Sequence, residues 1–195
     1  MNLKAWAIKL RDLKQLSRTG LLSLGYRCAL RVEPWIPPDS AALWNRGLEY
    51  VVKSIRSGVN DSSAGQLTRQ LSDCGAIACN ETSRIDETLG RCMNYATLTL
   101  ALTIDATSIK EDKELKKVII DIAKHSASIP AILGHANRVV APTGEDPVDH
   151  ASISVWDLIR ADIQRIEKIS DMSSIKDLRD LRDIWADGGF EWCSQ

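Results

Sequence analysis

The sequence predicts an all-α fold, a compact bundle of about eight helices in a chain of 195 residues. Apolar residues recur at helical spacing through most of the chain. Four serines each stand three residues before a side chain that can complete a capping box, and a helical pattern follows every box. One segment, residues 97–104, alternates as a strand does, but a single strand has nothing to pair with. We therefore predict helix there, with strand as the alternative.

The first three helices are predicted from the apolar pattern and its stops. An N-terminal helix carries Leu3, Trp6, Leu10 and Leu13 on one face. A second begins after Ser17 or Thr19 and reaches about Trp35, where Pro37 and Pro38 stop it. Asp39 or Ser40 caps a third, which ends at Ser57–Gly58.

The later helices are predicted from their capping boxes. These boxes are Ser63–Gln66, Ser83–Asp86, Ser108–Glu111 and Ser174–Asp177. In the helix predicted from the Ser83–Asp86 box, the apolar stripe begins at Ile85. A further helix between the last two boxes carries Trp156, Ile159, Ile163 and Ile166. The stretch Gly134 to His150 is the one long loop, and a loop of that length is often functional.

Two helices, near residues 18–36 and 84–104, are apolar on more than one face. A helix that is apolar all round is buried, so we expect these two at the centre of the bundle. The length fits one domain over residues 1–195. Two packed helical halves with a boundary near residue 106 would fit the same pattern.

The composition bears on several classes of function. With 25 basic and 26 acidic residues the net charge is −1, and nucleic-acid binders usually show a basic excess. No run approaches the roughly 18–20 apolar residues of a membrane span, and the charged N-terminus does not resemble a secretory signal. Five cysteines without a C-x-x-C pair indicate reduced thiols. We therefore expect a cytoplasmic protein that binds neither nucleic acid nor membrane.

Arg27 and Arg31 are the candidate site residues of the second helix, because both lie beside its apolar stripe. A buried guanidinium group must be paired. We expect an ion pair with an Asp or Glu of another helix, or an arginine that extends its head to solvent. The functional alternative is a site for an anion or for a carboxylate of a partner.

No metal, cofactor or catalytic group is predicted from the motifs. None of the three histidines has a second histidine at the spacing of a helical metal site. The acidic run from Glu111 to Glu114 fits a helix N-terminus, where negative charge suits the dipole. A divergent metal-dependent helical enzyme that uses Glu111 and Asp112 stays open as an alternative, although we favour a protein that is not an enzyme.

The segment "RCALRVEPW" and the "ALWNRGLEYV" that follows a short proline loop resemble a family of bacterial proteins. In that family, the immunity proteins of polymorphic toxin systems, a helix carries a Cys-Ala-x-x-Val-x-Pro pattern. Cys28, Ala29, Val32 and Pro34 match it here, and the resemblance covers roughly residues 17–105. It implies a small cytoplasmic all-helical protein that binds another protein, such as a toxin, and catalyses nothing. No binding residue is carried over from the family.

We therefore expect a non-catalytic protein-binding module, and the resemblance favours an immunity-type inhibitor of a toxin. The predicted contact surface is the loop from Gly134 to His150, where Arg138, Glu145 and Asp146 lie among apolar residues. A connector without a role explains the same loop equally well. The alternative function is a helical bundle that holds a small anionic ligand against Arg27 and Arg31. The sequence predicts no oligomeric state.

Overall fold

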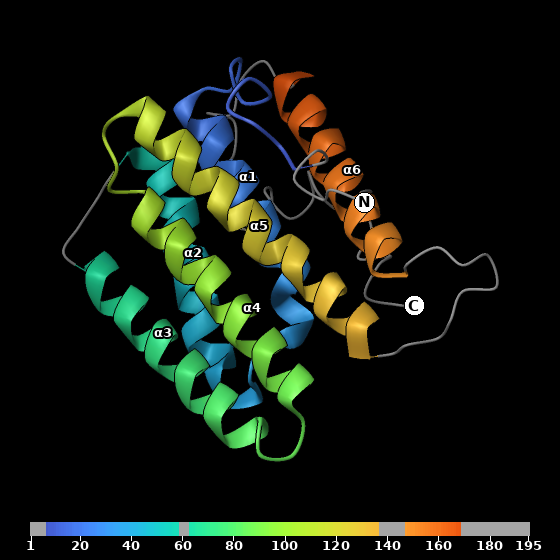
Figure 1. Cartoon of the computed structure of the whole chain (residues 1–195). Helices are drawn as coiled ribbons and strands as arrows, with labels where there is room; N and C mark the ends of the chain where they lie inside the picture. The colour runs from blue at the N-terminus through green and yellow to red at the C-terminus, as the bar shows by residue number, and fades with distance from the viewer. Residues whose placement is uncertain (1–6, 59–62, 137–146, 169–195) are drawn as a thin grey trace.

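The computed structural model describes residues 7–58, 63–136 and 147–168, and these are all-helical without a strand (Figure 1). The predicted all-α class is therefore confirmed, whereas the predicted count of about eight helices stays a prediction. The helices are α1 (Arg18–Val32), α2 (Ala41–Ser57), α3 (Ser63–Thr82), α4 (Glu87–Ala106), α5 (Asp112–Ala136) and α6 (Pro147–Lys168). Short 3-10 turns at Glu33–Trp35 and Pro38–Ser40 join α1 to α2. The described residues thus hold six α-helices, and the helix predicted behind Ser174 lies outside them.

The N-terminal helix predicted over Leu3 to Leu13 is wrong for its described part. Residues 7–17 form successive turns, in which the Asp12 amide donates to the Lys9 carbonyl over 2.9 Å. The Asp12 carboxylate also accepts from the Lys9 amide at 2.7 Å, and such local bonds compete with a helix. Leu13 is nevertheless buried, whereas Leu10, expected on the same apolar face, is 42% exposed.

Helix α1 begins and ends close to its predicted limits. The Ser17 hydroxyl accepts from the Gly20 amide at 3.1 Å, so Ser17 is the cap. The α-helix ends at Val32, earlier than expected, because Pro34 has no amide hydrogen to continue the ladder. At the end of α2, Gly58 adopts a φ of 62°, the left-handed conformation that glycine accepts at little cost.

Two of the predicted capping boxes are wrong. Helix α4 is capped by Asp86, whose carboxylate accepts from the Leu89 amide at 3.1 Å. Ser83 instead lies in the preceding turn, and its amide donates to the Cys79 carbonyl. Ser108 likewise bonds backward, from its hydroxyl to the Asp105 carbonyl. Both serines therefore finish the helix before them.

Residues 97–104 are helical, as predicted, and belong to α4. Their threonine hydroxyls bond to carbonyls one turn earlier. Thr99 donates to Tyr95 and Thr103 donates to Thr99, each over 2.7 Å. These bonds satisfy buried hydroxyl groups within the helix, so threonine-rich sequence is compatible with helix here.

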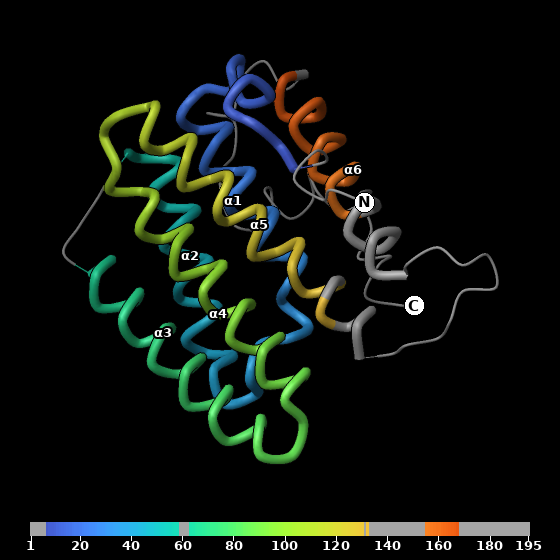
Figure 2. Tube along the Cα trace, viewed as in Figure 1, coloured from blue at the N-terminus to red at the C-terminus, as the bar shows by residue number. Residues whose placement is uncertain are grey.

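The long loop predicted over Gly134 to His150 is wrong at both ends. Helix α5 continues to Ala136, and α6 begins at Pro147. Figure 2 traces the path of the chain from α1 to α6. Proline suits the first position of a helix, because the amide that it lacks would have no helical partner there. Residues 137–146 lie outside the described part of the chain.

The two helices predicted as central pack against most of the bundle. α1 packs against α2, α4, α5 and α6, and α4 packs against α1, α2, α3 and α5. A Cβ atom on Gly25 of α1 would lie 3.1 Å from a methyl carbon of Thr103 on α4, so the glycine permits a close approach. The buried hydrophobic residues form one connected cluster that runs from Ile8 to Ile166.

Candidate functional site

The two candidate arginines lie against a carboxylate of α6. Arg27 and Arg31 are one helical turn apart on α1, and their side chains are 1% exposed. Asp162 of α6 reaches both: Arg27 Nε lies 3.7 Å from Asp162 Oδ1, and a terminal nitrogen of Arg31 pairs with Oδ2. We call these three residues the arginine–aspartate cluster. The partner predicted from another helix is thus Asp162.

Burial dominates the electrostatics of this cluster. It raises the pKa of Asp162, while the positive charges of Arg31 and Arg27 oppose that rise. Burial also lowers the pKa of Arg27, and the neighbouring charge of Arg31 lowers it further. Arg165, one turn along α6, adds a third positive charge that acts on both groups. The Asp162 carboxylate is thus buried next to two arginines whose charges favour its ionised form.

The cluster joins two helices, and its guanidinium groups are closed to solvent. A dissolved anion therefore has no direct access to the guanidinium groups of Arg27 and Arg31. Beside them, burial raises the pKa of the Cys28 thiol to about 12, so this thiol stays protonated at neutral pH. Cys28, Cys74, Cys79 and Cys92 are free thiols on helices, as predicted.

Of the remaining predicted site residues, Glu111 and Asp112 are the ones that the structure describes. Arg138, Glu145 and Asp146 lie outside the described residues. Glu111 and Asp112 are exposed at the start of α5. Within the described residues, no group of three metal-ligating side chains comes together.

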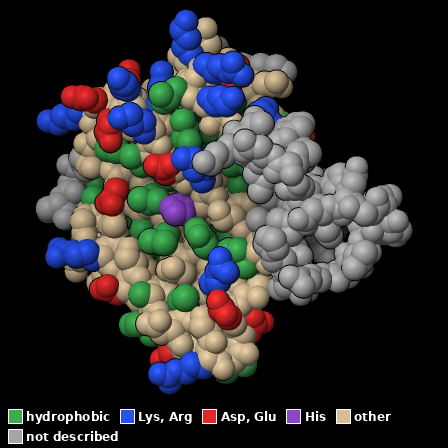
Figure 3. Space-filling model, in the orientation of Figure 1, with side chains coloured by type: hydrophobic (Ala, Val, Ile, Leu, Met, Phe, Trp, Pro, Cys, Tyr) green, Lys and Arg blue, Asp and Glu red, His purple; other side chains and the backbone are tan. Residues whose placement is uncertain are grey.

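His125 of α5 lies in a second partly buried environment, against Tyr95 of α4. The two ring centroids are 5.3 Å apart and the rings are tilted by 43°. Figure 3 shows hydrophobic side chains gathered in the middle of this face of the molecule. Burial lowers the pKa of His125, Lys124 lowers it further, and Asp121 opposes the shift. His125 is therefore held toward its neutral form.

The turn between α3 and α4 exposes an apolar side chain that was missed from the sequence. We call residues 81–87 the α3–α4 tip. Ile85 is 93% exposed there, although its spacing had placed it in the buried stripe. The helix begins two residues later, so Ile85 lies outside it. Asp86 is as good a cap as serine, and choosing it would have put Ile85 in the turn.

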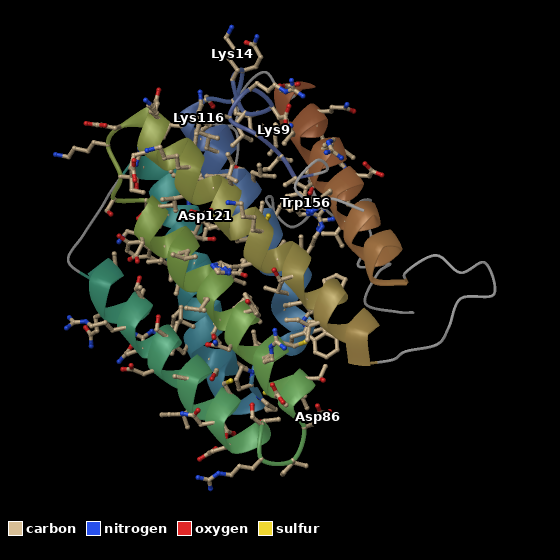
Figure 4. The ribbon with its side chains drawn as sticks, in the orientation of Figure 1. Lys9, Lys14, Asp86, Lys116, Asp121 and Trp156 are labelled. Atoms are coloured by element: carbon tan, nitrogen blue, oxygen red, sulfur yellow. The ribbon has the colours of Figure 1, made fainter. Side chains whose placement is uncertain are left out.

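The α3–α4 tip has charges around its apolar residue and lies far from the chain's described beginning. Glu81, Arg84, Asp86 and Glu87 are exposed on either side of Ile85. Asp86 marks this end of the molecule in Figure 4, while Lys9 and Lys14 mark the opposite end. The tip therefore combines an apolar centre with charges of both signs at one end of the bundle.

Comparisons of the chain with protein-family models, curated proteins and solved structures find no match. The resemblance to immunity proteins consequently stays a prediction. None of the described helices has the length and apolar character needed to cross a membrane.

Proposed function

We propose that this protein is a non-catalytic protein-binding module that acts as an immunity-type inhibitor of a toxin. The observation that supports this proposal is the α3–α4 tip, where Ile85 is 93% exposed and charged residues surround it. Protein interfaces commonly combine an apolar anchor with a polar rim. The partner would offer an apolar pocket with acidic and basic groups at its edge.

The geometry of the α3–α4 tip favours binding without a large loss of entropy. The amides of Ile85 and Asp86 both donate to the Thr82 carbonyl, at 2.9 and 2.7 Å. A Cβ atom on Gly90 would lie 2.8 Å from the Cys79 carbonyl oxygen, so the glycine brings α4 close to the end of α3. The backbone of a contact residue held in this way is ordered before the partner arrives.

Binding assays with a matched pair of variants test the proposal. Full-length protein recovers a partner from the host, and the partner is then purified for affinity measurements. We expect I85D to weaken binding at least about tenfold, as removal of an interface anchor does. L10D is the control, because Leu10 is also an exposed apolar residue and adjoins Lys9 at the opposite end. It should change the affinity less than about twofold, a shift of less than half a kcal/mol.

The same assay tests the predicted contact loop with the double variant E145A/D146A. If this variant lowers the affinity and I85D does not, the partner binds at the loop and the tip assignment is wrong. If the intact protein recovers no partner that binds again in purified form, the protein-binding proposal fails.

A further inference from the structure

Over residues 155–167, where the structure describes its side chains, the buried face of α6 is apolar except at one position. Val155, Ile159 and Ile166 are buried at spacings that keep to one side of a helix, with Ile163 beside them. Asp162 follows Ile159 by three residues and precedes Ile166 by four, so it occupies a place in this same face. Asp162 is itself buried, which is rare for aspartate unless it is paired.

Helix α1 carries two features that match this face. Gly20, Arg27 and Arg31 are seven and four residues apart, so they lie along one side of α1. A Cβ atom on Gly20 would lie 2.9 Å from a methyl carbon of Ile166, so Ile166 packs against bare backbone there. One turn away on α6, Asp162 meets both arginines.

These contacts give the two helices an antiparallel arrangement. Gly20 meets Ile166, and the later residues Arg27 and Arg31 meet the earlier residue Asp162. Figure 1 shows the same arrangement, because the blue start of α1 lies beside the end of α6. The two contacts are separated along the helices, so together they define one position of α6 along α1.

We propose that the arginine–aspartate cluster and the Gly20–Ile166 contact act as a register lock that fixes where α6 docks on α1. The apolar residues of α6 recur every turn, so they would pack almost as well after a slide of about 5.4 Å. On this buried face, within residues 155–167, a carboxylate occurs once, at Asp162. A slide by one turn would place Leu158 or Ile166 against two buried guanidinium groups, which is strongly unfavourable.

A single buried polar residue sets register in the same way in coiled coils. Here the consequence is specific to α6, which packs mainly on α5 and α1. Loss of the Asp162 charge would loosen α6 while leaving the packing of α3 on α4 unchanged.

Hydrogen exchange on the full-length chain tests the lock. We expect D162L to speed exchange of the α6 amides at least about tenfold relative to those of α4, because local opening follows local stability. D157L is the matched control: Asp157 is exposed on the same helix and pairs with Arg160 over 2.9 Å. It should leave α6 protected. The lock is disproved if D162L behaves as D157L does, or if D162L speeds exchange in α4 as much as in α6.

A relocated aspartate separates register from simple stability. The double variant L158D/D162L keeps one carboxylate on this part of α6 but moves it by one turn. We expect its α6 amides to exchange as fast as those of D162L, because Asp at position 158 can meet the arginines only by giving up the Gly20–Ile166 contact. Protection equal to that of the unchanged protein would overturn the proposal.

The neutral variant D162N keeps the experiment decisive if D162L does not fold. It retains the shape of the side chain and removes only its charge. The lock predicts faster exchange in α6 than in the D157N control, with α4 unchanged in both. Equal α6 protection in D162N and D157N would contradict it.

Discussion

Helices α1 and α3 differ in how much of their surface the rest of the bundle buries. α1 is buried without a break from Gly20 to Val32, including both arginines. α3 is longer, yet only Ala64, Leu67, Leu71 and Gly75 are buried along it. α1 has helices on several sides, whereas α3 packs on α4 and α2. The comparison shows that the position of a helix within the bundle decides whether an arginine on it is buried in an ion pair or exposed to solvent.

The largest expected difference is between an arginine of α1 and one of α3. R31A removes one partner of a buried ion pair, so it should lower the free energy of unfolding by about 3–5 kcal/mol. R69A should change it by less than about 0.5 kcal/mol, because Arg69 is exposed and only bonds the Gly65 carbonyl of its own helix. Urea unfolding of both variants measures this. If R31A and R69A lowered the free energy of unfolding by similar amounts, the contrast drawn between α1 and α3 would be wrong.

Two glycines test the same difference within α3. A Cβ atom on Gly75 would lie 1.9 Å from the Thr97 hydroxyl oxygen of α4, whereas a Cβ atom on Gly65 meets nothing within 4 Å. G75A should therefore cost about 1–3 kcal/mol through overpacking. G65A should gain up to about 1 kcal/mol, since alanine favours helix. Thermal unfolding compares them, and G75A/T97A, which removes the hydroxyl, should recover stability relative to G75A.

A smaller effect is expected at the start of α4. D86A removes the carboxylate that accepts from the Leu89 amide and should cost about 1 kcal/mol. S83A changes the residue that the sequence pattern favoured as the cap, and it should cost less than about 0.5 kcal/mol. Urea unfolding distinguishes the two. A larger loss in S83A would restore the cap predicted from the sequence.

The smallest effect concerns pH and His125. Burial lowers the pKa of His125, so the folded protein binds this proton less readily than the unfolded chain does. Its contribution to stability is therefore complete above about pH 6.5 and falls as the pH drops below that value. Urea unfolding at pH 7.5 and 5.5 should show a smaller advantage of the unchanged protein over H125Q at pH 5.5. If the stability advantage of the unchanged protein over H125Q were larger at pH 5.5 than at pH 7.5, the predicted pH dependence would be wrong.

The helix class could be predicted from the sequence because apolar spacing is a local property. The α2 stripe of Trp44, Leu48, Val51 and Ile55 is buried as its spacing indicates. The capping residues could not be chosen in this way, because Ser83 and Asp86 can both accept an amide hydrogen. Which one caps α4 depends on where α3 ends, since Ser83 bonds back to Cys79 of that helix.

The sequence by itself determined the all-helical class, the stop at Gly58 and the place of Arg27 and Arg31 beside the apolar stripe of α1. These follow from local geometry: helical periodicity, the left-handed conformation of glycine and the position of each residue on the helix. Only the tertiary structure decided that Asp162, more than 130 residues later in the chain, pairs with both arginines and that Ile85 faces solvent. Both outcomes depend on which helices pack together and where each one begins, and no local pattern in the sequence encodes either.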